Sequence, residues 1–177
     1  MRWFVISQSF AMTAASVSFP FYLLFIQNIG RSFSSFGFAY GLFTLSAALS
    51  HRVIGRLADH SGGVRLLILY AIGMSLVFLV IPSITSIEMV YLIQMILGIL
   101  GALQKTSEKL VISEMGHGDR KGALIGHYHF WTSLCSSIAV MATGYMLNYF
   151  TIGTIFYGCS LFFLASGICL IVYYDGK

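Results

Sequence analysis

Residues able to act as catalytic acids, bases or nucleophiles are sparse and scattered in this chain. Its aspartates, Asp59, Asp119 and Asp175, lie far apart, so they do not form the acidic cluster with which a lipid-headgroup transferase holds metal ions. No serine stands in the G-x-S-x-G or G-x-S-G setting that suits an intramembrane serine protease. The sequence therefore predicts no catalytic residue, and a six-helix intramembrane enzyme is the least favoured alternative.

Residue types that ligate metals also lack the necessary spacing. Cys135, Cys159 and Cys169 fall in long apolar runs without metal-ligand spacing or a disulfide framework, which is typical of small apolar fillers. His127 and His129 are two residues apart, so on a helix they point to different sides. We therefore expect no metal and no cofactor. Histidine can exchange a proton near neutral pH, so His129 is kept as a candidate proton-binding or substrate-binding group.

The composition indicates an all-α membrane protein. Apolar residues make up 58% of the 177 residues and charged residues only 9%, whereas a soluble domain is roughly 25% charged. A membrane-crossing helix needs about 20 mostly apolar residues, because its backbone must satisfy its own hydrogen bonds in lipid. Cutting the chain at its polar clusters predicts one domain, 1–177, with six transmembrane helices at 3–29, 36–50, 66–81, 87–107, 122–147 and 152–172.

The distribution of positive charge predicts the orientation in the membrane. If the six spans alternate in direction, every lysine and arginine except Arg31 falls on one side. The positive-inside rule makes that side the cytoplasm, so both termini are expected there, in the plasma membrane. The net charge of +4 is then explained without a nucleic-acid partner. An excess of lysine and arginine is typical of cytoplasmic loops beside membrane lipid.

Polar residues follow one face of two of the predicted spans. Residues Ser9, Thr13, Ser16, Pro20 and Gln27 recur at helical spacing in 3–29. In 87–107 the same spacing joins Tyr91, Gln94, Gly98, Gly101 and Lys105. Thr13, Ser16, Tyr91 and Gln94 are therefore the tentative solute contacts, together with His129. The competing interpretation is that the hydroxyls bond to their own helices and the glycines permit close packing.

The spans differ in polarity in an order that repeats. Spans 66–81 and 152–172 are the least polar, so we expect them to face lipid, while 3–29, 87–107 and 122–147 turn polar groups inward. The first and fourth spans are polar, and the third and sixth are apolar. This order predicts two three-helix repeats, the second inverted in the membrane because three is an odd number.

The run Gly55-Arg56-Leu57-Ala58-Asp59-His60-Ser61-Gly62 is expected in the cytoplasmic connection between the second and third spans. There it resembles the G-x-L-A-D-r-x-G-r-r signature of the major facilitator superfamily. The segments 120–126 and 144–156 resemble the entry into helix 5 and the passage into helix 6 of that family. The chain departs from the signature after Gly62, where Gly63 and Val64 precede Arg65.

The resemblance implies an amino-terminal six-helix half of a transporter that moves a small solute by alternating access. It also implies a cytoplasmic gate, to which we assign Gly55, Arg56, Asp59, Gly62, Arg65 and Glu108. In that gate Arg56 or Arg65 is expected to bridge to Glu108 or Glu114, and such a contact could break in one state and form in the other.

The number of spans predicts how such a half would be completed. Family transporters have about twelve spans around a site at the midplane. Because six is even, two copies insert in the same orientation, so a homodimer is expected, with a second transporter half as the other option. Protons are a candidate coupling ion. The alternative function is a non-transporting membrane subunit or a truncated remnant of a twelve-helix transporter.

Overall fold

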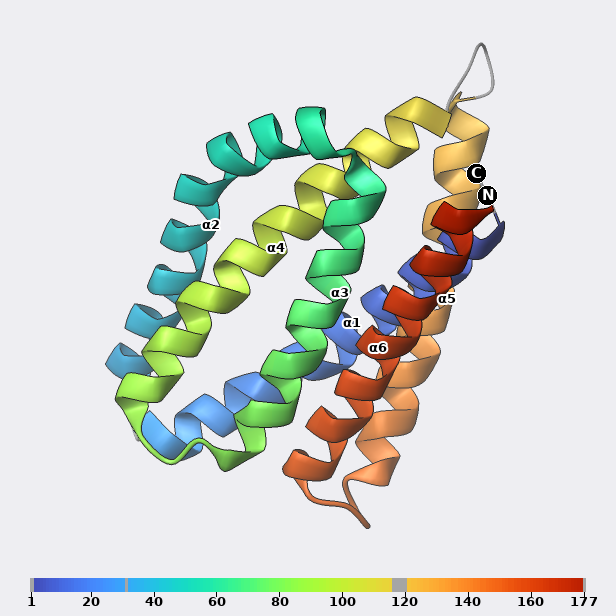
Figure 1. Cartoon of the computed structure of the whole chain (residues 1–177). Coiled ribbons are helices and arrows are strands. Elements are labelled where there is room, and N and C mark those ends of the chain that lie inside the picture. The colour runs from blue at the N-terminus through green and yellow to red at the C-terminus, as the bar shows by residue number, and fades with distance from the viewer. Residues whose placement is uncertain (1, 31, 116–120, 177) are drawn as a thin grey trace.

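The computed structural model describes residues 2–30, 32–115 and 121–176. Within these ranges the chain forms six α-helices and one short 3-10 turn (Figure 1). Their bounds are α1 Arg2–Gly30, α2 Phe33–Ser61, α3 Gly63–Val80, η1 Ile81–Ser83, α4 Ile87–Met115, α5 Lys121–Met146 and α6 Ile152–Asp175. Each predicted span falls largely on one of these helices, so the all-α class expected from composition is confirmed.

Two predicted features of the second span are wrong. The helix predicted at 36–50 continues to Ser61, so most of the glycine-containing run at 55–62 is the last two turns of α2 and not a loop. Helix α2 ends at Gly62, which adopts φ +84, a backbone conformation that favours glycine. The Gly62 N–H donates to the Ala58 carbonyl at 2.9 Å. Polar residues at the end of a long helix were thus mistaken for a connection.

Five of the helices, all except α5, are long and apolar enough to cross a bilayer within the described residues. Helix α5 has the length, with 26 residues, but its serines, threonines and histidines make it less apolar. It nevertheless packs against α1. A helix of this kind turns its polar groups toward neighbouring helices when it lies in lipid.

The helices pack as two groups of three that meet at α3 and α6. In one group α4 packs against α2 and α3, and in the other α1 packs against α5 and α6. Hydrogen bonds between small side chains tie the apolar surfaces together. Ser75 and Ser160 join α3 to α6, with hydroxyl oxygens 3.0 Å apart, and the Ser7 hydroxyl donates to the Ser166 carbonyl at 3.0 Å.

The expectation that α3 and α6 face lipid as peripheral helices is wrong for α3. More of its apolar window, 56%, is buried inside the bundle than in any other candidate span, while α2 has only 11% buried. The place in the bundle explains the difference, because α3 packs against both α4 and α6, whereas α2 packs mainly against α4. Ala71 of α3 and Gly167 of α6 let those two helices approach closely. Apolarity on all sides therefore reflects central packing here as well as contact with lipid.

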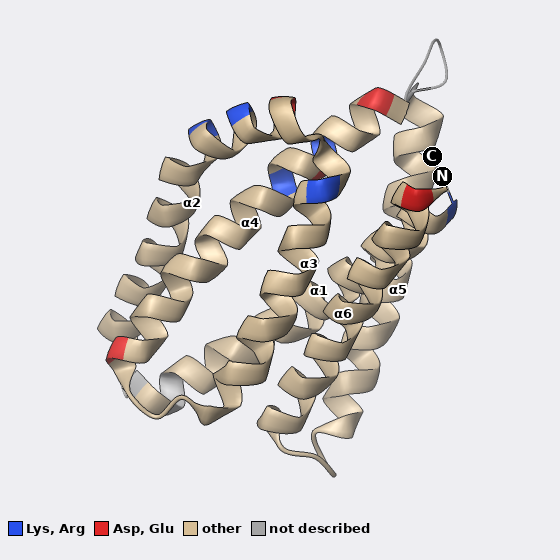
Figure 2. Cartoon of the chain, in the orientation of Figure 1, with Lys and Arg blue, Asp and Glu red and all other residues tan. Residues whose placement is uncertain are grey.

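Charged side chains gather at one end of the bundle. Figure 2 shows lysines and arginines where α2 and α4 finish and α3 begins, and α1 begins with Arg2 beside the chain ends. Both ends of the chain lie at that same end of the bundle. Glu88, in the first turn of α4, lies at the opposite end. The helices therefore have a basic end and a nearly uncharged end.

Candidate functional site

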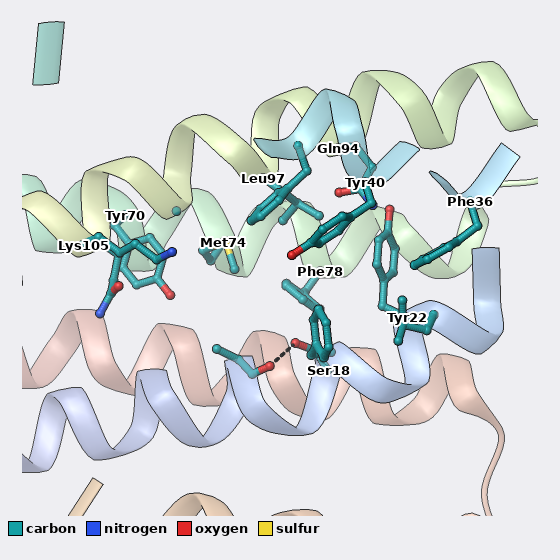
Figure 3. Close-up of a pocket in the computed structure, with 16 residues that line it drawn as sticks. Ser18, Tyr22, Phe36, Tyr40, Tyr70, Met74, Phe78, Gln94, Leu97 and Lys105 are labelled. Atoms are coloured by element: carbon teal, nitrogen blue, oxygen red, sulfur yellow. Dashed lines mark hydrogen bonds between the residues drawn. The ribbon is translucent and has the colours of Figure 1, made fainter. Parts of the chain in front are cut away.

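A cavity of about 210 Å³ lies between α1, α2, α3 and α4. Figure 3 shows side chains from these four helices pointing into it. We call it the central pocket. Its lining residues are Ala15, Ser18, Phe19, Tyr22, Leu23, Phe36, Tyr40, Phe43, Tyr70, Met74, Phe78, Gln94, Leu97, Gly101, Gln104 and Lys105.

The α4 wall of the central pocket follows directly from helical spacing. Gln94, Leu97, Gly101 and Gln104 are separated by three, four and three residues, so they form one stripe along the helix. Close packing of α2 against α4 places the opposing rings. A Cβ at Gly98 would lie 2.0 Å from the Ser46 hydroxyl oxygen and 2.3 Å from the Phe43 carbonyl oxygen, so only glycine fits there.

Two buried polar groups in the central pocket have no protein partner. Tyr22 is 8% exposed, and its hydroxyl makes no hydrogen bond with a described residue. Figure 3 shows that ring standing between α1 and α4 with the hydroxyl pointing toward α4. Gln94 is 4% exposed and also forms no hydrogen bond to the described part of the chain. Buried polar groups are normally paired, so these two are available to a ligand.

Of the five predicted solute contacts, only Gln94 lines the central pocket. Thr13 is buried on another side of α1, where it lines two apolar cavities of about 490 and 540 Å³ beside α5 and α6. Ser16 is half-buried and lines neither the central pocket nor the two apolar cavities. Tyr91 packs its ring 5.0 Å from that of Phe38. His129 is exposed on α5.

Sequence reasoning missed most of the aromatic lining and the two polar residues at the basic end of the pocket. Gln104 and Lys105 could have been found, since Lys105 already belonged to the predicted stripe on this helix. Tyr22 could have been found from its position one turn after Ser18 on α1. Tyr40 and Phe43 carried no such signal, because they are two of several aromatic residues on α2 and neither belongs to a polar stripe.

The charged residues of the predicted gate form no ion pair with one another among the residues that the structure describes. Glu108 accepts hydrogen bonds from Gln104 Nε2, at 2.6 Å, and from the Tyr128 hydroxyl. Arg65 donates to the Tyr174 hydroxyl through Nε at 3.0 Å and Nη2 at 2.6 Å. No ion pair links Arg56, Asp59, Arg65 and Glu108 within the described residues. The bridge expected from Arg56 or Arg65 to Glu108 or Glu114 is therefore not formed here.

The two glycines of the predicted gate, Gly55 and Gly62, and the neighbouring Gly63 have different roles in the structure. Gly62 takes the positive φ that ends α2, and Gly63 lets α3 begin close to α4, because a Cβ there would lie 2.9 Å from the Ser107 carbonyl oxygen. A Cβ at Gly55 would meet nothing within 4 Å. Packing inside this chain thus requires Gly63 but leaves the surface beside Gly55 open.

A metal centre has no support in the described part of the chain. No group of three or more histidine, cysteine, aspartate or glutamate side chains there could hold a metal ion. The central pocket itself is lined by no carboxylate, thiol or imidazole. Its chemistry is that of a binding site with aromatic walls, two amides, hydroxyls and one ammonium group.

Comparison with known proteins agrees with this arrangement. The model of the Major Facilitator Superfamily matches residues 4–176. A relative from Bacillus subtilis (strain 168), described as the uncharacterized MFS-type transporter YitZ, is 42% identical over 157 residues, which cover 89% of this chain and 96% of the relative. No solved structure matches. These similarities point to a multi-pass membrane transporter rather than an enzyme, and the chain belongs to the major facilitator superfamily.

Proposed function

We propose that this chain is a half-size secondary transporter that moves a small solute through the central pocket by alternating access. The observation that carries the proposal is the buried Tyr22 hydroxyl, which has no protein partner, inside a cavity between helices. Gln94, a 4% exposed residue of the same cavity, likewise forms no hydrogen bond to the described part of the chain. A solute that binds there would satisfy groups that the protein leaves without hydrogen bonds. Tyr91, Thr13 and Ser16 remain candidate contacts for a pocket that changes shape.

The helix pairs support an inverted three-helix repeat. Exchanging α1 with α4, α2 with α5 and α3 with α6 turns the α2–α4 pair into α5–α1, and the α3–α4 pair into α6–α1. The α3–α6 pair maps onto itself. Repeats of opposite orientation are the element that lets a transporter present one site to each side of the membrane in turn.

The gate residues at the basic end would change partners during this transition. Arg56 and Asp59 are exposed on the last turns of α2, and no described residue pairs with them. Arg65 is held by Tyr174 and Glu108 by Gln104 and Tyr128. In the proposed second state, Arg65 and Glu108 give up these partners, and they then contact Asp59 or the partner half. Gly55 and Gly62 lie beside these residues at the end of α2. Alternating access needs two such sets of contacts of similar stability.

Orientation and location follow from the charged end. The basic end would face the cytoplasm, with both termini there, and the helices would cross the plasma membrane. The exposed apolar side chains of the helix flanks would contact membrane lipid. His129, exposed on α5 two residues after His127, remains a candidate for proton coupling.

The site would be completed by a second half, either another copy of this chain or a different half-transporter. Helix α2 is the least buried of the candidate spans and exposes large apolar side chains along its length. Among these are Phe33, Leu45, Leu49 and Val53. It borders the central pocket through Phe36, Tyr40 and Phe43, so a partner on α2 would also close that pocket. Mass measurement in detergent tests this point, and a strictly monomeric protein would argue against it.

The test of the transport proposal is solute uptake by vesicles that contain the purified chain alone. The solutes tested form a panel of aromatic carboxylates, aromatic amides, aromatic amines and one sugar. We expect saturable uptake of at least one of them. Gln94→Leu should reduce that uptake at least tenfold. Ser137→Ala should not, because Ser137 is exposed on α5 and its hydroxyl bonds to its own helix at the Ser133 carbonyl. Folded protein that moves none of the panel, with or without a pH gradient, would overturn the proposal.

A further inference from the structure

The central pocket has the composition of a site for an organic anion with an apolar, ring-bearing body. Seven aromatic side chains line it: Phe19 and Tyr22 from α1, Phe36, Tyr40 and Phe43 from α2, and Tyr70 and Phe78 from α3. Opposite them stands the polar stripe of α4. We propose that the transported solute is an amphipathic carboxylate whose rings lie among these aromatic residues and whose charged group pairs with Lys105. The inference rests on the proposed transport function and adds the chemical class of the solute.

The polar groups are arranged along the pocket and not around it. Gln94 and Lys105 are eleven residues apart on α4, which is about 16 Å along the helix axis. Figure 3 shows Lys105 with Tyr70 at one end of the pocket, and Tyr22, Tyr40, Phe36 and Gln94 toward the other. An elongated solute with one charged end matches this separation.

The Lys105 ammonium is free to pair with a ligand. No ion pair links Lys105 to a carboxylate within the described residues. The nearest acidic residue along α4, Glu108, already accepts hydrogen bonds from Gln104 and Tyr128. Lys105 lines the pocket but is itself exposed to solvent, so water partly screens a charge pair formed there. The aromatic walls would therefore supply most of the binding, and the ammonium group would supply the preference for an anion.

Other solute classes fit the lining less well. A sugar needs hydrogen-bonding partners on most of its circumference, and the pocket is walled mainly by rings and aliphatic side chains. An organic cation would meet Lys105 and no carboxylate among the lining residues. The Tyr22 hydroxyl and the Gln94 amide remain for one or two polar substituents on the apolar body.

The test compares three probes of one shape that differ in charge: 6-phenylhexanoate, its neutral amide and 6-phenylhexylamine. Binding to the purified protein is measured by titration calorimetry, and uptake is measured in vesicles. The carboxylate should bind up to about fivefold more tightly than the amide, the range of an exposed ion pair, and the amine should bind weakest. The shorter 3-phenylpropionate should bind more weakly than 6-phenylhexanoate, since it cannot reach the rings and Lys105 together.

Two lysine variants on α4 isolate the proposed charge pair. Lys105→Gln should remove the preference for the carboxylate over the amide. Lys109→Gln should keep it, because Lys109 is exposed on the same helix and does not line the pocket. Equal binding of acid and amide to the unmodified protein, or an equal loss in both variants, would overturn the anion proposal.

The outcomes for solute class and for transport can be separated. If the amide or the amine enters vesicles best and Gln94→Leu abolishes that uptake, transport stands and the anion proposal falls. If folded protein binds none of the probes and moves no solute of the panel, both proposals fall.

Discussion

The side-chain amide of Gln104 lies with its Nε2 atom 2.6 Å from Oε2 of Glu108, one turn further along α4. Gln104 lines the central pocket, and Glu108 also accepts a hydrogen bond from Tyr128 of α5. One carboxylate therefore connects the pocket wall with a helix of the other three-helix group. Movement of α5 relative to α4 would change the position of Gln104 in the pocket.

Replacing Glu108 or Tyr128 should lower the stability of the protein, and the effects of the two replacements should be coupled. We expect Glu108→Gln and Tyr128→Phe each to cost about 1.5–3 kcal/mol, the usual contribution of a hydrogen bond to a charged group. The double variant should cost clearly less than the sum, because both changes remove the same contact. Reversible unfolding in detergent measures all three values. Strict additivity would mean that Tyr128 and Glu108 do not interact in the folded protein.

Close packing of α2 on α4 depends on Gly98. We expect Gly98→Ala to destabilise the protein by about 1–3 kcal/mol, since the new Cβ must displace backbone or the Ser46 hydroxyl. Gly41→Ala on α2 is the matched control: nothing lies within 4 Å of its Cβ position. That control should be neutral or stabilising by up to about 1 kcal/mol from helix propensity. Thermal unfolding of the two variants tests this, and similar effects for both would contradict the observed helix packing.

Gln8 is fully buried, and neither end of its side-chain amide has a partner among the described residues. Replacing it by methionine, which has a similar shape, should stabilise the protein by about 1–3 kcal/mol by removing an unsatisfied group. Its neighbour Ser7 offers the opposite case, because its hydroxyl is bonded to Ser166. Ser7→Ala should therefore destabilise. Chemical unfolding should show opposite signs, and a destabilised Gln8→Met would indicate that the amide is bonded in the protein.

Asp59 should matter for transport and not for stability. It is exposed near the end of α2 and pairs with no described residue, so Asp59→Asn should leave the unfolding free energy within about 0.5 kcal/mol of the original. Solute uptake should fall at least tenfold if Asp59 forms the gate contact of the second state. Asp175→Asn, at the end of α6, serves as the charge-matched control. Unchanged uptake by the Asp59 variant would remove this residue from the gate.

The sequence predicts the helices well because lipid imposes a simple rule. Every span had to be long, apolar and helical, so the six elements could be placed from hydropathy. The polar stripe on α4 was also readable, since it depends on spacing within one helix. Gln94 belongs to that stripe and lines the central pocket.

Relations between helices could not be read in the same way. The turn of α2 that aims Tyr40 and Phe43 into the pocket is fixed by contact at Gly98, a tertiary feature. Thr13 belongs to a convincing stripe, yet α1 has neighbours on several sides and Thr13 faces α5 and α6. The end of α2 was missed because charged residues at a cytoplasmic helix end resemble a loop.

The most direct measurement of the central claim is the accessibility of the pocket from each side of the membrane. With Cys135, Cys159 and Cys169 replaced by serine, Gln94→Cys would be labelled with a membrane-impermeant maleimide in vesicles of either orientation. Met95→Cys is the control at the same depth, because Met95 is 47% exposed on the outer flank of α4 and should meet lipid. We predict labelling of the Gln94 variant from both sides, slowed by bound solute, and none of the control. Labelling from one side only, or from neither, would contradict alternating access through this pocket.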